Sequence, residues 1–483
     1  MNDLKKKALN GVSWSFLDNI ANSGITFLVG LVLANILSPA EFGMVGIITI
    51  FIAISNSIMD SGFSNALIRK KDATNTDYNT IFIFNLILGT ILSLLLFISA
   101  PTIGYFFHQK EALTPLVQGM SIILIINSLG IVQRTLLVKK VDFKTQTKIS
   151  LIASCISGII GIIMALKGYG VWSLIAQQIS RQSLTTIFLW IFNKWRPAFE
   201  FSIESFKELF GFGSKLLISG LIDTIYKNAY AVVIGKYYTD AQLGQYDQAQ
   251  KFNTIFSSNL TNIIQRVSYP VLCKIQDEET RLKTTYQKVI KYTMIITFAC
   301  MLGLAAVAKP LLLFLVGEKW LEATEYLQII CFVGMMYPLH SINLNILQVK
   351  GRTDLFLRLE IIKKIIAIGP IIIGIFFGIK FMLIGGVLTS FIAYFLNTYY
   401  SSDLINYGIG EQIKDIIPSF VVSLIVAFFM WSITMLNYPN WATLIIQIIT
   451  GGTLAILIYE LLKLPEYLEM KNIALSIIKR KKI

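Results

Sequence analysis

Long apolar stretches follow one another along the chain and are separated by short polar connections. A helix needs about 20 mainly apolar residues to cross the hydrocarbon core of a bilayer. Windows of that length predict fourteen membrane-spanning helices, at residues 12–37, 43–67, 79–107, 114–138, 147–166, 169–192, 208–235, 243–270, 287–315, 323–348, 357–379, 381–404, 414–436 and 441–463. These spans are too long for an outer-membrane barrel, whose strands alternate over about ten residues. The pattern predicts an all-α integral membrane protein.

Two of these spans carry polar side chains at helical spacing. In the span at 208–235 the polar positions are Lys215, Ser219, Asp223, Tyr226, Lys227 and Tyr230. The first span repeats this design with Ser15, Asp18, Asn19, Asn22 and Thr26. Residues three or four apart share one face of a helix, and lipid cannot solvate a charged face. We therefore expect two helical lobes that face each other across a polar cavity lined by these two spans.

Short internal matches indicate a duplication. Residues 38–43 (SPAEFG) resemble residues 239–244 (TDAQLG), and residues 138–142 resemble residues 349–354 in their Val-Lys pair and following Asp. Each match occupies the same place in its series of spans, which predicts a six-helix unit repeated in parallel with pseudo-two-fold symmetry. The expected divisions are an N-terminal lobe at 1–196, a C-terminal lobe at 197–405, and two additional spans with a basic tail at 406–483.

Composition and charge placement support a membrane location. The 483 residues are 55% apolar and only 14% charged, whereas a soluble domain carries about 25% charged residues. The net charge of +14 comes from Lys and Arg concentrated in alternate connections, such as 69–71, 139–148 and the tail at 479–482. This asymmetry predicts that both termini are cytoplasmic, which requires an even number of spans, twelve or fourteen. The basic start lacks a cleavage signal and is expected to remain part of the first span.

The sequence gives little support for catalysis. It contains two histidines, His108 and His340, and no Ser/His/Asp arrangement, HExxH motif or Gly-rich phosphate loop in a suitable context. The four cysteines stand far apart and have no metal-site spacing. We therefore expect neither an enzyme nor a bound metal or cofactor.

Charged residues inside the spans are the main functional candidates. A Lys or Arg at mid-bilayer costs about 2.5–3.5 kcal/mol unless water or an anion solvates it. A wet cavity with excess positive charge suits an anionic cargo, and both residue types bind phosphate well. The candidates for the substrate cavity are Lys215, Lys227, Arg181, Lys251, Asp223, Asp18, Asn22 and Asp60, with Arg134, Arg266 and His340 as secondary candidates.

Several of these residues have a second interpretation. Snorkelling to the headgroups is the alternative for three bases near predicted cytoplasmic ends, Arg134, Arg266 and Lys291. His340 is more simply interpreted as a hydrogen-bonded packing residue. Three acids are open between proton or sodium sites and counter-ions to the bases, namely Asp18, Asp60 and Asp223. Kinks are expected at Pro101, Pro338 and Pro370. Those at Pro338 and Pro370 are open between bending points for alternating access and static packing features.

Many short pieces of the chain occur together in one known family. They include LANILSPAEFGMVG (33–46), GFSNALIRKKDATNTDYNTIFIFN (62–85), GYGVWSL (168–174), LGQYDQAQ (243–250) and NLNILQVKGRTDLFLRLEIIKK (343–364). With these pieces the sequence resembles the polysaccharide flippases of the WzxC/TuaB type, within the multidrug/oligosaccharidyl-lipid/polysaccharide exporter superfamily. The resemblance covers the chain to about residue 405. Asn35 departs from it, because a basic residue is expected in the usual L-A-R run.

The resemblance implies a specific activity. The protein would move a polyprenyl-diphosphate-linked oligosaccharide from the inner to the outer leaflet of the bacterial cytoplasmic membrane by alternating access. The product would serve lipopolysaccharide, capsule or teichuronic-type biosynthesis, and a polymerase and chain-length machinery would be partners of a monomeric flippase. Coupling to H⁺ or Na⁺ stays open.

Two rival functions are expected to differ in recognisable ways. A cation-coupled multidrug exporter of the same fold should line its cavity with acids and aromatic residues, whereas bases predominate here. A membrane polysaccharide polymerase or ligase usually needs a large extracytoplasmic loop, and the predicted outer connections are short.

Overall fold

The computed structural model describes residues 2–60 and 62–480. In this part of the chain every regular element is a helix, which confirms the all-α class. The elements are α1 (Asn2–Ile36), α2 (Pro39–Asp60), α3 (Phe63–Arg69), α4 (Asn75–Phe106), α5 (Lys110–Lys139), α6 (Phe143–Leu166), α7 (Val171–Phe192), α8 (Ile203–Tyr237), α9 (Asp240–Lys274), α10 (Glu279–Val316), η1 (Glu318–Trp320), α11 (Leu321–Gly334), α12 (Tyr337–Val349), α13 (Thr353–Ile366), α14 (Ile368–Phe377), α15 (Ile379–Ile405), α16 (Ile409–Ser432), η2 (Ile433–Leu436), α17 (Asn440–Leu462) and α18 (Pro465–Arg480).

Eleven helical segments of the described residues are long and apolar enough to cross a membrane. They coincide with eleven of the predicted spans. The other three predicted spans fall on α7, on α9, and on the pair α13 and α14. α7 and α9 are long enough but more polar, and α13 and α14 are each too short to span alone. The number fourteen therefore stays a prediction.

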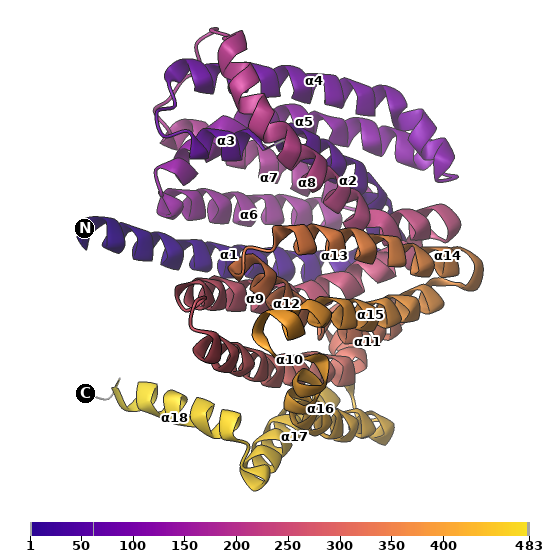
Figure 1. The fold of residues 1–483 in the computed structure, drawn as a ribbon. Coiled ribbons are helices and arrows are strands. Elements are labelled where there is room, and N and C mark those ends of the chain that lie inside the picture. Colours follow the sequence, from indigo (N-terminus) through magenta and orange to yellow (C-terminus); the bar gives the residue numbers. More distant parts are fainter. Residues whose placement is uncertain (1, 61, 481–483) are drawn as a thin grey trace. The chain divides into compact units, whose positions relative to one another are not determined.

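The described chain forms two compact units, Met1–Gly244 and Gln245–Ile483. Helix α8 lies in the first unit, although the internal repeat places it at the start of the second lobe. In the first unit α4 packs along α5, α1 along α6, and α6 along α7, as Figure 1 shows. The lobe boundaries at 196 and 405 rest on the repeat and stay predictions.

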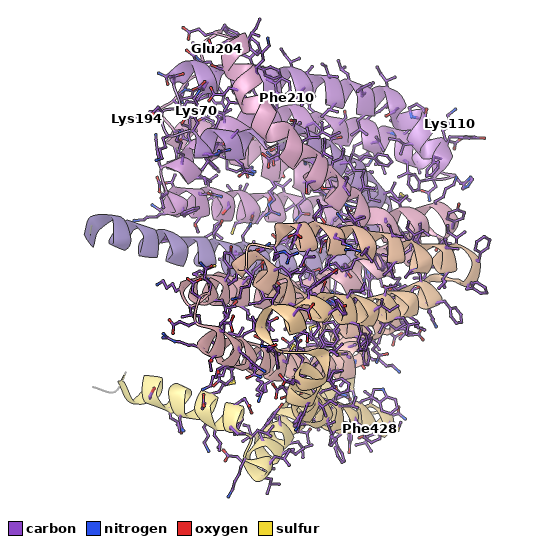
Figure 2. The ribbon with its side chains drawn as sticks, viewed as in Figure 1. Lys70, Lys110, Lys194, Glu204, Phe210 and Phe428 are labelled. Carbon is purple, nitrogen blue, oxygen red and sulfur yellow. The ribbon has the colours of Figure 1, made fainter. Side chains whose placement is uncertain are left out.

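Successive connections of the first unit alternate between its two ends. Lys70 and Lys194 lie at one end, whereas Lys110 lies at the opposite end (Figure 2). This is the arrangement expected when successive helices run up and down through a bilayer and the more basic loops share one side.

The two matched segments begin their helices in the same way. At the start of α2 the Ser38 N–H donates to Glu41 Oε2 at 2.7 Å, and the Glu41 N–H donates back to Ser38 Oγ at 3.4 Å. At the start of α9 the Thr239 N–H donates to Gln242 Oε1 and the Gln242 N–H donates to Thr239 Oγ1, both at 3.3 Å. Each is a capping box, which satisfies N–H groups that a helix start leaves unpaired.

These two helix starts also contact each other through their glycines. A side chain added at Gly43 would overlap the carbonyl oxygen of Asp240. A side chain added at Gly244 would overlap the carbonyl oxygen of Pro39. In the sequence match Gly43 corresponds to Gly244 and Pro39 to Asp240, so the contact is reciprocal. Only glycine lets the two backbones approach this closely.

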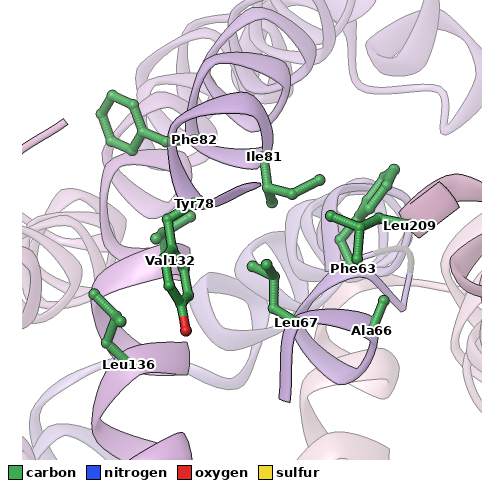
Figure 3. Close-up of a cluster of buried hydrophobic side chains, with 9 residues drawn as sticks. All are labelled: Phe63, Ala66, Leu67, Tyr78, Ile81, Phe82, Val132, Leu136 and Leu209. Carbon is green, nitrogen blue, oxygen red and sulfur yellow. The ribbon is translucent and has the colours of Figure 1, made fainter. Parts of the chain in front are cut away.

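The first unit contains a cluster of buried apolar side chains (Figure 3). Side chains from α3, α4, α5 and α8 meet there: Phe63, Ala66, Leu67, Tyr78, Ile81, Phe82, Val132, Leu136 and Leu209. Lys70 beside this cluster binds Glu208 of α8 at 2.8 Å and Asp77 of α4 at 3.1 Å. The hydrogen bond to Glu208 is the main reason that the pKa of Lys70 is raised. Apolar burial and one ion cluster therefore hold α8 against α3 and α4.

Two of the three predicted proline kinks interrupt a helix in the second unit. α11 and α12 are separated at Met335–Met336, just before Pro338. α13 ends at Ile366 and α14 begins at Ile368, with Pro370 in its first turn. Proline has no N–H and its ring collides with the carbonyl four residues earlier, which here belongs to Ile366. Pro101 instead lies inside the continuous helix α4.

Candidate functional site

A polar network joins α1, α6 and α7 in the first unit. Arg181 Nη2 on α7 donates to Asn22 Oδ1 on α1 at 3.0 Å, and Ser154 Oγ on α6 donates to the same oxygen at 2.6 Å. One turn earlier on α1, the Asp18 carboxylate accepts a short hydrogen bond from Ser150 Oγ, and its charge acts on Arg181. Three predicted site residues, Asp18, Asn22 and Arg181, are thus brought together.

A second chain of amides crosses α2, α5 and α7. Gln182 Nε2 donates to Asn127 Oδ1 at 2.9 Å, and Asn127 Nδ2 donates to Asn56 Oδ1 at 2.8 Å. Gln182 follows Arg181 in the chain, so both polar chains meet on α7. Sequence reasoning missed Gln182 and Asn127 as site residues. The isolated Asn127 in the apolar run IILIINSLG was the available signal.

Asp60 lies one turn after Asn56 on α2 and interacts electrostatically with Arg134 of α5. Asp60 Oδ1 on α2 accepts from Ser64 Oγ at 2.7 Å, and the Asp60 charge acts on the Arg134 guanidinium of α5. Helices α2 and α5 pack against each other. Arg134 therefore has an acidic neighbour inside the protein in addition to any contact with headgroups.

The stripe on α8 contains an exposed ion pair. Lys227 Nζ lies 2.7 Å from Asp223 Oδ2, one helical turn away, and the two side chains are 67% and 46% exposed. The Ser202 side chain caps the start of this helix by accepting the Ser205 N–H at 3.2 Å. The side chain of Lys215 lies outside the described residues.

On α9 the base Lys251 is exposed and interacts electrostatically with Asp247, one turn earlier. Both residues belong to the second unit. The side chain of Arg266, farther along α9, lies outside the described residues. The expected convergence of Lys215, Lys227, Arg181 and Lys251 on one cavity stays a prediction.

His340 of the second unit is half-buried and contacts buried polar side chains. Its Nε2 is 2.9 Å from Ser390 Oγ and its Nδ1 is 3.3 Å from Asn397 Nδ2, both on α15. Nearby, Tyr286 donates to Asn343 Oδ1 at 2.7 Å, and Asn343 exchanges hydrogen bonds with Gln412. The described residues contain no group of three or more His, Cys, Asp or Glu side chains that could hold a metal ion.

Sequence comparison gives one family and several relatives. The model of the family described as "Polysaccharide biosynthesis protein" matches residues 32–325. The teichuronic acid biosynthesis protein TuaB of Bacillus subtilis is 29% identical over 358 residues, 74% of each chain. The lipopolysaccharide biosynthesis protein WzxC of Escherichia coli is 25% identical over 377 residues, 77% of this chain and 76% of WzxC.

Solved structures share the fold. The lipid II flippase MurJ in an inward closed conformation superposes with a TM-score of 0.74 at 16% identity, over 94% of this chain and 100% of MurJ. An inward-facing multidrug resistance MATE transporter gives a TM-score of 0.63 at 16% identity, over 79% of this chain and 95% of the transporter. At 16% identity the likeness shows a shared fold and does not identify the cargo.

Proposed function

This chain belongs to the family of polysaccharide biosynthesis proteins, and we propose that it is a flippase for a lipid-linked oligosaccharide. Its cargo is a polyprenyl-diphosphate-linked repeat unit, which moves from the inner to the outer leaflet of the bacterial cytoplasmic membrane by alternating access. The names of its relatives support this assignment, because TuaB, WzxC and the transport protein ExoT are named for the biosynthesis of teichuronic acid, lipopolysaccharide and succinoglycan. MurJ, which shares the fold, carries a flippase name.

The polar setting of Arg181 is the observation that carries the proposal. A guanidinium has five N–H donors, and the described hydrogen bond to Asn22 uses one of them. The half-buried Arg181 is stabilised by Asn22 and by the nearby charge of Asp18. A diphosphate supplies oxygens for the other donors, and Arg binds phosphate in a bidentate manner.

The finer assignment extends this site across the predicted cavity. Lys215, Lys227 and Lys251 add positive charge for the diphosphate, and the sugar occupies polar space while the prenyl tail stays in lipid. The protein works as a monomer with fourteen spans and both termini in the cytoplasm, next to a polymerase and chain-length machinery. It performs no covalent chemistry.

A multidrug exporter is the second candidate, because MATE transporters share the fold. The charge at the site favours the flippase. Cationic drugs require acidic or aromatic surroundings, and the network on α7 is centred on a guanidinium. Binding of a cationic dye in place of a prenyl diphosphate would favour the exporter.

Replacing Lys227 by Ala tests the proposal in cells. The expected result is less surface polysaccharide at an unchanged level of the protein in the membrane, because the cavity loses one charge for the diphosphate. Lys110→Ala is the control, since Lys110 lies at the start of α5, in the predicted connection between the spans at 79–107 and 114–138 and outside the proposed cavity. Unchanged polysaccharide in the Lys227→Ala strain would argue against the assignment.

Vesicles give the direct measurement. The purified full chain is reconstituted with a fluorescent polyprenyl-diphosphate oligosaccharide, and the fraction of label reaching the opposite leaflet is followed. Wild type is expected to transfer the label, and Arg181→Ala to transfer it at least about tenfold more slowly, because a hydrogen bond to a charged group contributes about 1.5–3 kcal/mol. Equal rates in empty vesicles and in protein-containing vesicles would overturn the flippase assignment.

A further inference from the structure

Three amide side chains form one continuous hydrogen-bonded chain in the first unit. Gln182 of α7 donates to Asn127 of α5 at 2.9 Å, and Asn127 donates to Asn56 of α2 at 2.8 Å. All three residues are half-buried, so protein encloses each of them only in part. This amide chain therefore differs from the amide pair of the second unit, in which Gln412 and Asn343 bond each other and are fully buried.

The two ends of the amide chain keep unused hydrogen-bonding groups. Asn56 accepts from Asn127 through Oδ1, and its Nδ2 donates to no atom of the described residues. Gln182 donates through Nε2, and its Oε1 accepts no hydrogen bond from the same part of the structure. Neither atom belongs to the buried polar atoms that lack a partner, so a ligand can reach both. The amide chain thus presents N–H donors at one end and a carbonyl acceptor at the other.

A donor end and an acceptor end together match hydroxyl groups. A hydroxyl both donates and accepts, whereas the oxygens of an ionised phosphate only accept. The acceptor on Gln182 is therefore satisfied by a hydroxyl and would repel a phosphate oxygen. If all three amides turn over, the direction of the chain reverses and its ends exchange roles. This adaptability suits a sugar, whose hydroxyls point in several directions.

The amide chain starts one residue after Arg181. Gln178, Arg181, Gln182 and Thr185 follow one another on α7 at a spacing of three, one and three residues, which places them on one side of the helix. In a polyprenyl-diphosphate oligosaccharide the first sugar is bonded directly to the diphosphate. A diphosphate held by Arg181 therefore brings the first sugar beside Gln182.

Other hydrogen bonds already join α5 to α7. Thr186 of α7 donates to the carbonyl of Ile126 at 3.0 Å, and Trp190 of α7 donates to the carbonyl of Leu129 at 2.9 Å. Both carbonyls lie within two residues of Asn127. Amide side chains can also serve only to hold helices together. Here the free ends of the amide chain make no such contact within the described residues, so helix packing does not account for them.

We propose that Gln182 and Asn56 form a binding subsite for the sugars of the cargo and that Asn127 positions them. The Gln182 amide binds a hydroxyl of the sugar attached to the diphosphate. The Asn56 amide binds a hydroxyl farther along the oligosaccharide, because the Asn127 side chain and two hydrogen bonds separate it from Gln182. The subsite rests on the proposed function, since it requires a prenyl-diphosphate cargo.

Equilibrium binding separates recognition of the sugar from recognition of the diphosphate. The purified full chain is titrated in detergent with polyprenyl diphosphate and with the same lipid carrying one glucose, galactose or N-acetylglucosamine, each labelled on the prenyl chain. Wild type is expected to bind at least one glycosylated lipid more tightly than the plain lipid. Gln182→Met keeps the length of the side chain and removes its amide. It is expected to weaken binding of that glycosylated lipid about fivefold, the effect of one neutral hydrogen bond, and to leave the plain lipid unchanged.

Two further variants complete the test. Asn127→Leu is expected to give the same selective loss, because Gln182 then lacks its partner. If Asn127→Leu does not fold, Gln182→Met still decides, since it leaves the bond between Asn127 and Asn56 in place. Gln328→Met is the matched control, because Gln328 is a half-buried residue of the second unit that donates from α11 to the Ala305 carbonyl of α10 at 3.3 Å. Normal binding of the plain lipid shows that a variant is folded.

The possible results distinguish the subsite from the proposed function. Equal affinity of wild type for the plain and all glycosylated lipids would overturn the subsite, as would an unchanged affinity for them in Gln182→Met. An equal loss for both kinds of lipid in Gln182→Met would assign the amide chain a structural role instead. Binding of neither kind of lipid by wild type would contradict the proposed function itself, and the subsite with it.

Discussion

At the scale of single residues, the contact between the starts of α2 and α9 depends on two glycines. Gly43 and Gly244 each leave room for a carbonyl oxygen of the other helix start. Both lie in helices, where glycine costs about 0.5–1 kcal/mol relative to alanine. Glycine nevertheless occupies both matched positions, because the two backbones approach each other too closely there for a side chain.

Gly43→Ala is therefore expected to destabilise the protein. The new methyl group would overlap the carbonyl of Asp240, and overpacking of this kind costs about 1–3 kcal/mol. Gly24→Ala is the matched control, because nothing lies within 4 Å of a side chain added at Gly24 in α1. Thermal unfolding of the purified proteins is expected to rank Gly43→Ala below wild type and Gly24→Ala at or above it. Equal melting temperatures for the two variants would contradict the contact.

Asn22 is expected to position Arg181. Asn22→Leu removes the acceptor of both the Arg181 guanidinium and the Ser154 hydroxyl while keeping similar volume. Transfer of the fluorescent prenyl-diphosphate oligosaccharide should fall about tenfold, because a hydrogen bond to a charged group contributes about 1.5–3 kcal/mol. Asn22→Asp retains an acceptor oxygen and should still orient Arg181, so its apparent affinity for the cargo is expected to stay closer to wild type. Similar losses in both variants would indicate a purely structural role.

Residue types were predictable here, and most partners were not. An Arg inside an apolar span can be recognised from the sequence as a candidate site residue, because lipid cannot solvate its charge. That Arg181 bonds Asn22, about 160 positions earlier, depends on how α1 and α7 pack, which no local pattern contains. Gln182 was missed because a neutral amide costs less free energy inside a span than a charged group does, so its presence there does not by itself indicate a site.

At the scale of elements, α18 is held to α10 by ion pairs on successive turns. Glu466 binds Lys291 at 3.0 Å and Glu469 binds Lys288 at 3.2 Å. Hydrogen bonds from Tyr292 and then from Lys288 lower the pKa of Glu469 below its ordinary value of 4.5. A carboxylate with a lowered pKa contributes stability above the unfolded value and loses it as the pH falls through the folded value.

Docking of α18 is thus expected to weaken in acid. Hydrogen exchange over residues 465–476 should accelerate as the pH falls below about 4.5, after correction for the intrinsic exchange rate. Glu469→Gln should show faster exchange already at neutral pH and a smaller pH response. Glu278→Gln, which removes an exposed pair with Arg281, serves as the control. A wild-type segment with no pH response would refute this account of docking.

Element boundaries could be predicted where backbone chemistry decides them. The capping boxes at Ser38 and Thr239 and the breaks before Pro338 and Pro370 follow from local rules. Pro101 shows the limit, because α4 continues through it while packing along α5. Neighbouring helices can stabilise a backbone that proline weakens, and the sequence of one span does not contain its neighbours.

At the scale of the whole molecule, three of the predicted spans decide the topology. α7, α9 and the pair α13–α14 are the predicted spans that do not meet the length and apolarity expected of a spanning helix. α7 and α9 contain charges that the proposed site uses, Arg181 and Lys251, and α13 contains the ion pair of Glu360 and Lys363. Charged residues inside a span lower its mean hydropathy, so the spans with candidate binding residues are the hardest to recognise from the sequence.

Cysteine labelling on both sides of these helices decides whether they cross. With the four native cysteines replaced by serine, single cysteines replace Lys167 and Lys194 around α7, Tyr237 and Asp277 around α9, and Arg352 and Lys380 around α13–α14. If all three elements cross, positions 167, 237 and 380 react with an impermeant maleimide in intact cells, whereas 194, 277 and 352 react only after permeabilisation. The positive-inside asymmetry requires this alternation, because the basic connections must share the cytoplasmic side. A pair that reacts on one side alone identifies an element that does not cross, and it would reverse the orientation of every later helix.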